Sequence, residues 1–209
     1  MSTLTLRPKT TEANPSNMDY TLILYPNSGE SAHEDIDEAI SDGDSTYLLS
    51  DAQGAGDARF GLPNHSTESG TINSVKAFAL VRVTDSSLTK DVQVGVYVAA
   101  THYYSDSIDI GSETYVLKSN SWAQNPNTSS AWTWNDIDSL EVLLLLQQAT
   151  ASRAGACYPR CTQVYVEVDY TETSTSIKTV FGIPSANIKT INGVPIADVK
   201  SWLGISNVD

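Results

Sequence analysis

The sequence is poor in basic residues and has no long apolar run. Its 209 residues include 12 lysines and arginines against 25 aspartates and glutamates, a formal net charge of −13 at pH 7. Nucleic acids and anionic membranes are bound by clustered basic residues, so we expect neither as a partner. No run of about 18 apolar residues occurs, so we expect no segment that spans a membrane. The start of the chain lacks the apolar segment of a secretory signal, so we expect synthesis in a cytoplasm.

Cysteine is scarce as well. The two cysteines, Cys157 and Cys161, are separated by three residues. A redox pair is normally Cys-x-x-Cys, and a structural zinc site needs further cysteine or histidine ligands nearby. The pair therefore fits either two free thiols or a local disulfide that closes a hairpin tip.

Motifs of the common catalytic classes are missing too. The sequence contains no Gly-x-Ser-x-Gly, no His-Glu-x-x-His and no phosphate-binding glycine loop. The three histidines, His33, His65 and His102, are scattered through polar segments. We therefore expect no enzymatic activity and no obligatory cofactor.

Short segments with period-two alternation dominate the rest of the sequence. Valine fills every second position from Val92 to Val98, and residues 77–83 and 164–170 alternate in the same way. Gly, Asp, Asn, Ser and Pro separate about eight such segments, and no long amphipathic helix is expected. The pattern predicts an all-β fold, an antiparallel β-sandwich of the jelly-roll type. We interpret residues 140–146 and 164–170 as a central hairpin, with the first strand covered on both faces.

Composition divides the chain into four parts. Residues 1–19 form a polar, extended N-terminal arm, residues 20–170 the sandwich domain, and residues 171–176 a polar linker. Residues 177–209 contain three repeats of eleven residues that read [IV]-K-[TS]-x-x-G-[IV]. A repeat this short cannot bury its own apolar face, so it must pack on the sandwich, on copies of itself or on another protein. The residues expected to serve anchoring or oligomerisation are Ile177, Gly182, Ile188, Gly193, Val199, Trp202 and Gly204, and Trp202 is expected to pack against a partner subunit.

Several aromatic residues occur in or beside predicted loops. Sugar-binding sandwiches stack pyranose rings on such side chains, because Tyr and Trp combine an apolar ring with a polar group. The candidate glycan-binding residues are Tyr103, Tyr104, Trp122, Trp132 and Trp134. The alternative for Trp132 or Trp134 is that it caps one end of the core.

Aspartates cluster near predicted turns between residues 35 and 57. Calcium takes oxygen ligands from such loops, and Asp37, Asp42 and Asp44 are the candidate ligands. The spacing is not that of an EF-hand, and aspartates in turns commonly bond their own backbone. Both interpretations of Asp42-Gly43-Asp44 stay open.

Several segments resemble β-sandwich proteins encoded among the structural genes of tailed phages and prophages. The resemblance rests on Leu24-Tyr25-Pro26, Asp42-Gly43-Asp44-Ser45-Thr46-Tyr47, Ile72-Asn73-Ser74-Val75, Asn125-Pro126, Leu140-Glu141-Val142 and residues 162–170, and on the tail units at residues 188–194 and 199–201. It implies a non-enzymatic component of the virion with a lectin-like jelly roll. A capsid decoration or head-fibre protein is the first expectation, and a tail-fibre or adhesin module that binds host-surface glycans is the alternative. The resemblance implies two kinds of partner, other virion proteins and further copies of the chain in an oligomer such as a trimer.

Overall fold

The computed structural model describes residues 1–12, 22–25, 31–50, 55–86, 90–148 and 158–172, together with six short strands of the tail. The chain divides into two compact units, Met1–Thr171 and Glu172–Asp209. No helix of the described residues has the length and apolar character needed to cross a membrane.

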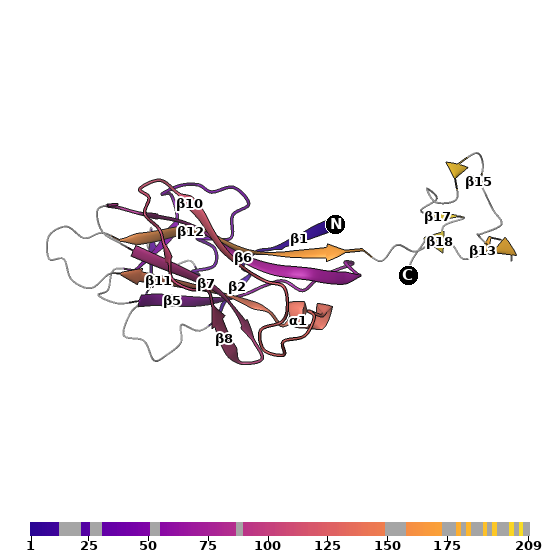
Figure 1. Ribbon diagram of the computed structural model, residues 1–209. Helices are drawn as coiled ribbons and strands as arrows, with labels where there is room; N and C mark the ends of the chain where they lie inside the picture. The colour runs from indigo at the N-terminus through magenta and orange to yellow at the C-terminus, as the bar shows by residue number, and fades with distance from the viewer. Residues whose placement is uncertain are drawn as a thin grey trace. The chain divides into compact units, whose positions relative to one another are not determined.

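The first unit is a sandwich of two antiparallel sheets, as predicted (Figure 1). Sheet A has the order β10-β6-β12-β4-β3, and β1 also pairs with β12. Sheet B has the order β2-β5-β11-β7-β8, and β9 also pairs with β7. The strands of sheet A are β1 (Ser2–Leu6), β3 (Leu22–Tyr25), β4 (Tyr47–Ser50), β6 (Thr71–Val83), β10 (Val116–Trp122) and β12 (Pro159–Thr171). Those of sheet B are β2 (Thr10–Glu12), β5 (Ala55–Gly61), β7 (Lys90–Val98), β8 (Thr101–Tyr104), β9 (Ile108–Asp109) and β11 (Glu141–Gln148).

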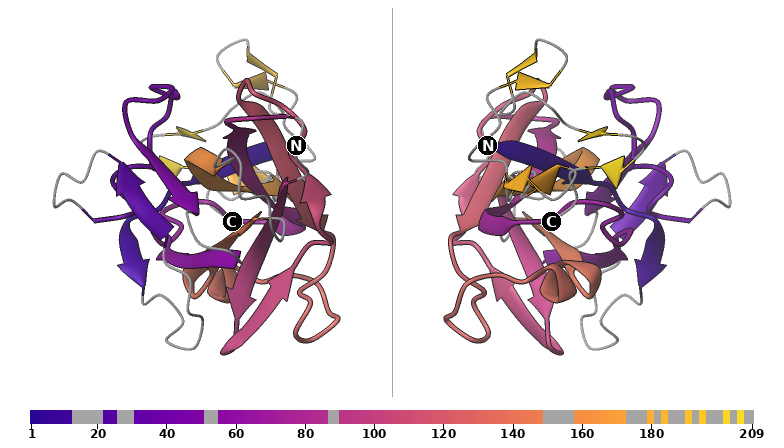
Figure 2. Two further views of the ribbon diagram at one scale, coloured as in Figure 1. Left: turned by 90° about the vertical axis from the view of Figure 1, so that its left-hand side faces the viewer. Right: turned by 90° about the vertical axis from the view of Figure 1, so that its right-hand side faces the viewer.

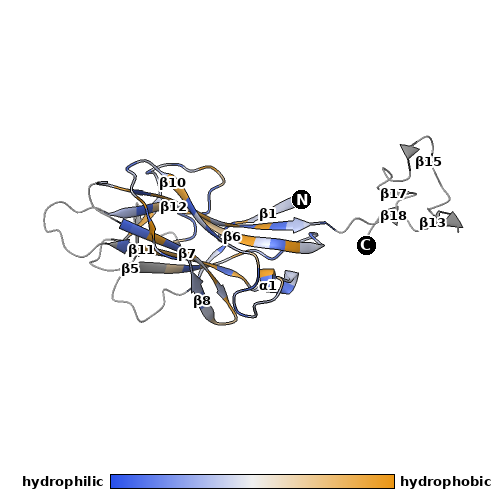
Figure 3. Ribbon diagram, in the orientation of Figure 1, coloured by the Kyte–Doolittle hydropathy of each residue, from blue (hydrophilic) through white to orange (hydrophobic). Residues whose placement is uncertain are grey.

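The core lies between the two sheets and follows the predicted alternation. The core residues of β7 alternate without a break, and those of β6 and β12 alternate except at two register shifts between these strands, after Cys161 and after Asp169. Figure 3 colours the strands by hydropathy. The strand β11 is buried on both faces, because Val142, Leu144 and Leu146 belong to the core while Leu143 and Leu145 are covered on the outer face. The continuous apolar run of β11 is explained by this double cover.

The predicted central hairpin is wrong. The strand β11 pairs with β5 and β7 in sheet B, whereas β12 pairs with β6, β4 and β1 in sheet A. The two apolar runs therefore face each other across the core instead of sharing hydrogen bonds. Two strands that both carry apolar core residues fit either arrangement, so their sequences did not distinguish a hairpin from a sheet-to-sheet crossing.

The expected N-terminal arm belongs to the sandwich as far as it is described. Leu4 and Leu6 of β1 stand opposite Val168 and Val166 of β12, and β2 pairs with β5 in the other sheet. Residues 13–19 lie outside the described residues. The extended start of the chain thus contributes a strand to each sheet, and its short alternating Leu-Thr pattern is the signal for the first of them.

Residues 101–140 contain three strands, β8, β9 and β10, whose sequences lack the apolar alternation of β7. A short helix, α1 (Trp134–Asp138), lies at one end of the sandwich (Figures 1 and 2). Thr133 caps it, because its hydroxyl accepts from the Asp136 N–H while the Asp136 carboxylate accepts from the Thr133 N–H.

The second unit contains three two-stranded sheets that repeat with the period of the sequence. They are β13 (Thr179–Val180) with β14 (Ile183–Pro184), β15 (Thr190–Ile191) with β16 (Val194–Pro195), and β17 (Ser201–Trp202) with β18 (Ile205–Ser206). In each unit two residues separate the strands, and the second of them is glycine. A two-residue connection with glycine is typical of tight hairpins.

Candidate functional site

The outward positions of sheet B form a surface rich in rings and amides, which we call the B face. Two rows of residues cross it perpendicular to the strands. Glu141, Tyr97 and His102 stand opposite one another on β11, β7 and β8. The next row consists of Glu12, Arg59, Leu143, Gly95 and Tyr104. Five neighbouring strands span about 19 Å, so a linear ligand could contact several side chains along one row.

Tyr104 lies against the backbone of β7 because residue 95 is glycine. A Cβ atom at Gly95 would stand 2.7 Å from the Tyr103 carbonyl oxygen and 2.9 Å from Cδ1 of the Tyr104 ring. The exposed His102 precedes Tyr104 on the same face of β8, with ring planes 16° apart and centroids 6.1 Å apart. Two neighbouring rings thus present nearly parallel planes on the edge strand of sheet B.

Arg59 links the rings to a carboxylate. Its Cζ lies 4.2 Å from the centroid of Tyr97, and its Nε lies 2.7 Å from Oε2 of Glu141. The Tyr97 ring in turn meets His102 edge-on, with centroids 4.9 Å apart. Burial raises the pKa of Glu141, an effect that Arg59 opposes and Glu12 reinforces. These contacts fix the orientation of Tyr97 and hold two charged groups beside it.

A row of hydrogen-bonding side chains lies further along β7 and β11. Gln93 donates from Nε2 to the Ser105 carbonyl at 2.6 Å, and Gln147 donates from Nε2 to Oε1 of Gln93 at 3.2 Å. Ser107 donates to Oε1 of Gln147 at 3.3 Å. A primary amide has two N–H donors and two acceptor positions, so the row has hydrogen-bonding capacity beyond these three bonds.

The five aromatic residues predicted to bind glycans do not form one site. Tyr104 lies on the B face, but the Tyr103 ring packs toward the core and its hydroxyl donates to Oδ1 of Asn127 at 3.0 Å. Trp132 is buried and donates from its indole N–H to the Trp122 carbonyl at 3.0 Å, and Trp122 itself packs on the core. Trp134 donates to the Gly70 carbonyl and also packs on the core. The core-packing alternative thus describes both Trp132 and Trp134.

Sequence reasoning missed Arg59, Gly95, Tyr97 and His102. A signal for two of them was present in the alternation of residues 91–99. If the valines face inward, then Gln93, Gly95 and Tyr97 must face outward together. Cross-strand neighbours such as Arg59 and His102 depend on strand order and register, which the sequence does not specify.

The outer face of sheet A, which we call the A face, carries cations that rest on rings. Of the five cation–aromatic contacts among the described residues, four lie on this face. They are Arg7 on Tyr165, Lys76 on Phe78, Arg82 on Tyr115 and Arg160 on Tyr47. Phe78 and Tyr165 are cross-strand partners whose rings stack on each other, with centroids 4.6 Å apart.

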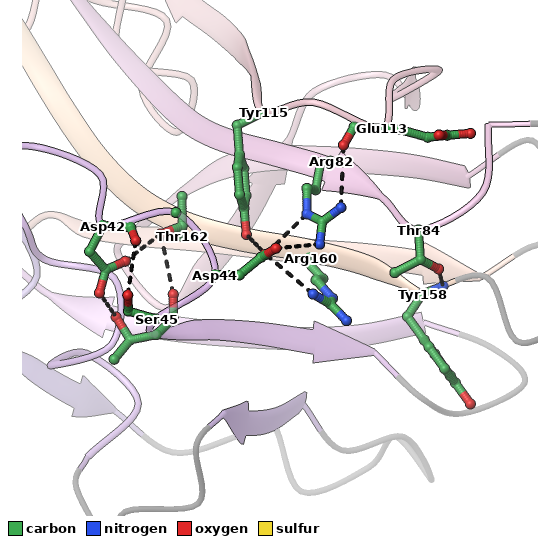
Figure 4. A network of polar contacts seen from close by, with 12 residues as sticks. Asp42, Asp44, Ser45, Arg82, Thr84, Glu113, Tyr115, Tyr158, Arg160 and Thr162 are labelled. Carbon is green, nitrogen blue, oxygen red and sulfur yellow. Dashed lines mark hydrogen bonds and ion pairs between the residues drawn. The ribbon is translucent and has the colours of Figure 1, made fainter.

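Asp44 lies at the centre of a polar network at one end of the A face (Figure 4). Arg82 donates to both of its carboxylate oxygens, at 2.6 and 3.1 Å, and Arg160 donates to Oδ1 at 3.2 Å. Tyr115 adds a hydroxyl donor at 2.9 Å. Burial acts to raise the pKa of Asp44, but the hydrogen bonds from Tyr115 and Arg82 outweigh it and lower that pKa. Burial and the contact with Asp44 raise the pKa of the Tyr115 phenol.

The aspartates proposed as calcium ligands, Asp37, Asp42 and Asp44, are not brought together as a cation site. While Asp44 pairs with arginines, Asp42 accepts from the hydroxyls of Thr46 at 2.8 Å and Thr162 at 3.3 Å (Figure 4). Within the described ranges, no group of three His, Cys, Asp or Glu side chains is arranged to hold a metal. The turn chemistry considered as the alternative accounts for Asp42, whose carbonyl also accepts from Ser45. A calcium site remains a prediction.

The cysteine pair is described only in part. Cys161 is a buried free thiol on β12 that donates to the Gln163 carbonyl at 3.3 Å. Burial raises the pKa of this thiol to about 12, so it is protonated and unreactive at neutral pH. Cys157 lies outside the described residues.

Most of the predicted anchoring residues also lie outside the described part of the chain. These are Ile177, Gly182, Ile188, Gly193, Val199 and Gly204, whereas Trp202 is a residue of β17. The roles proposed for them stay predictions.

No family model and no curated protein matches the sequence. Among solved structures, the chain is similar to a xylan-binding module, CBM15, at 9% identity and a TM-score of 0.43, over 82% of this chain and 99% of that one. It is also similar to CBM35 from Cellvibrio japonicus Abf62, at 8% identity and a TM-score of 0.39, over 83% of this chain and 97% of that one. A third is the enzymatically active domain of tailspike protein 4 from bacteriophage CBA120, at 8% identity and a TM-score of 0.37, over 78% of this chain and 19% of that one.

Proposed function

We propose that the protein is a non-catalytic carbohydrate-binding protein whose ligand lies across the B face. The observation that carries this proposal is the pair of nearly parallel rings of His102 and Tyr104, with Tyr104 lying against Gly95. Such rings can stack on a sugar ring, and the hydroxyl or ring nitrogen at their edges offers hydrogen bonds. This arrangement differs from Trp132 and Trp134 at the end of the sandwich, whose N–H groups already donate to backbone carbonyls.

Polar groups beside the rings would orient the ligand. A binding site for a small molecule or a sugar combines apolar contact with a few fixed hydrogen-bonding groups. Arg59 and Glu141 are fixed by their ion pair and by Tyr97, and Gln93 is fixed by Ser105. Arg59 shares the row of Tyr104, and Glu141 and Gln93 stand on either side of that row, so a saccharide that extends from the Tyr104 ring across the strands would reach them.

The charge of the B face favours a glycan without acidic groups. Glu12, Asp91 and Glu141 occupy outward positions of sheet B, against the single cation Arg59. The whole chain also carries a net charge of −13. An acidic polysaccharide would be repelled by this surface, so we expect uncharged glycans to bind best.

A glycan array probed with the full chain tests the proposal. Replacing Tyr104 with Ala should weaken binding at least about tenfold, because central aromatic contacts carry most of the energy of such interfaces. Tyr165→Ala on the A face is the matched control and should leave the affinity unchanged. Equal losses in both variants, or no glycan bound by the wild type, would refute the proposal.

The sequence resemblance supports a second proposal, that the protein is a component of a phage virion. The tail favours this proposal, because its units at residues 188–194 and 199–201 carry part of the sequence resemblance and contribute strands to two of its hairpins. A glycan-binding sandwich on a virion would serve contact with the host surface, on a tail fibre or as a capsid decoration. Mass spectrometry and immunogold labelling of purified particles test this, and absence of the chain from particles would contradict it.

A further inference from the structure

The tail repeats its backbone pairing as regularly as its sequence. In each unit an inner pair of residues stands next to the connection: Val180 with Ile183, Ile191 with Val194, and Trp202 with Ile205. An outer pair follows: Thr179 with Pro184, Thr190 with Pro195, and Ser201 with Ser206. The inner pair is therefore apolar on both strands in all three units, and the outer pair is not.

Three hairpins of this size need a further surface to pack against. Each has only two residue pairs, and the three sheets are separate in the described part of the tail. A two-stranded hairpin on its own is marginally stable at best in water, and short repeats become stable when neighbouring units cover their apolar faces. The inner pairs are the positions where such cover would bury apolar surface.

Charge distinguishes the tail from the sandwich. Residues 1–171 carry 22 of the 25 acidic and nine of the 12 basic residues, a net charge of −13. Residues 172–209 carry three acidic and three basic residues, so their net charge is zero. Sandwich domains of different copies therefore repel one another, whereas tails do not, and segments of zero net charge associate most readily.

We propose that the tail is a homotypic interface, in which the three hairpins of one copy pack in register on the three hairpins of another copy of this chain. A surface that repeats every eleven residues is matched best by a surface with the same period. The rest of this sequence offers no such repeat, whereas a second tail offers three units at the required spacing. This inference is independent of glycan binding, although it would make that binding multivalent.

Light scattering coupled to size-exclusion chromatography tests the interface on the full chain. The wild type should be an oligomer, with a mass of two or more times 22.5 kDa. A variant with three aspartates at inner positions (Val180→Asp, Ile191→Asp and Trp202→Asp) should run as a 22.5 kDa monomer. The control with three aspartates at outer positions (Thr179→Asp, Thr190→Asp and Ser201→Asp) adds the same charge and should keep the wild-type mass.

Three outcomes would overturn the proposal. The first is a monomeric wild type at every concentration from micromolar to millimolar. The second is an inner variant that stays oligomeric, and the third is an outer variant that dissociates as fully as the inner one. A failure of glycan binding can be distinguished from a failure of the interface. A short soluble glycan should bind each copy with the same affinity in the wild type, the inner variant and the outer variant. On an immobilised polysaccharide, the inner variant should lose about 100-fold in apparent affinity through loss of avidity.

Discussion

The two outer faces of the sandwich are built by the same alternation but use their aromatic residues differently. On the A face, Phe78 and Tyr165 stack on each other, and Lys76 and Arg7 rest on them. On the B face, Tyr104 lies against a glycine and next to a nearly parallel histidine ring. The rings of the A face are therefore stacked on each other and on cations, whereas Tyr104 of the B face lies against backbone.

The comparison separates two roles of an outward aromatic residue. A ring that stacks on its cross-strand neighbour contributes to the stability of its sheet. A ring that lies against a glycine on the next strand covers the backbone of that strand, and on the B face it is part of the proposed binding surface. Substitutions on the A face should therefore change the stability and leave binding intact, and substitutions on the B face should do more to binding than to stability.

The largest effect is expected at Gly95. In Gly95→Val, the new side chain would collide with the Tyr103 carbonyl, the Tyr104 ring and Cβ of Leu143. We expect a loss of about 3 kcal/mol in the free energy of unfolding, measured by urea denaturation, because the backbone groups cannot move aside easily. Glycan binding should be lost together with it, since Tyr104 must leave the strand.

Gly43→Val is the control for a change at glycine. Gly43 has a φ of 75°, and a Cβ atom at this position would meet nothing within 4 Å, so the cost comes from the backbone and not from collision. The substitution should reduce the stability and leave glycan affinity unchanged. Normal affinity in Gly95→Val would contradict the proposed position of the ligand.

The sequence predicted the sandwich because alternation reports burial directly. The valines of β7 and β12 are buried as expected, and the double cover of β11 was visible in its continuous run. The B face could not be predicted, because it joins Arg59, Gly95 and Tyr104 from three strands whose order was unknown. Edge strands such as β8 and β10 give only a weak signal in the sequence, since their polar residues face water and show no apolar period.

A smaller effect on stability is expected on the A face. Tyr165→Ala removes the stack on Phe78 and the ring beneath Arg7. We expect a loss of about 2 kcal/mol in unfolding free energy, which combines lost ring packing with a lost cation–aromatic contact. Thermal unfolding measures it, and Ser119→Ala, on the neighbouring strand opposite Phe78, is the control for the face. Loss of glycan binding in Tyr165→Ala would remove the distinction between the two faces.

The Asp44 network should give the A face a dependence on pH. The pKa of Asp44 is lowered in the folded protein, so its stabilising contribution is complete above the unfolded value of about 3.9 and disappears as the pH falls through the folded value. The side chain is 48% exposed, so we expect Asp44→Asn to cost only about 1 kcal/mol at pH 7. The unfolding free energies of both proteins, measured by urea denaturation, should converge as the pH falls below about 3.9 and through the lowered pKa of Asp44. A constant difference across this range would show that the carboxylate charge is not the source of the stability.

An effect of similar size, but stabilising, is expected in the turn between β7 and β8. Ala99 and Ala100 connect Val98 to Thr101 with φ values of 48° and 63°, which are unfavourable for alanine. Both φ values are positive in a two-residue type I′ turn, and Asn-Gly is the sequence that this turn prefers. The double substitution Ala99→Asn and Ala100→Gly should therefore add about 1 kcal/mol and raise the Tm by about 3 °C. The reversed pair, Ala99→Gly with Ala100→Asn, should add less. The substitutions lie in the turn and should not move the rings of His102 and Tyr104, so glycan affinity should stay at the wild-type value in both variants. A changed affinity would mean that the backbone of the turn sets the positions of these rings.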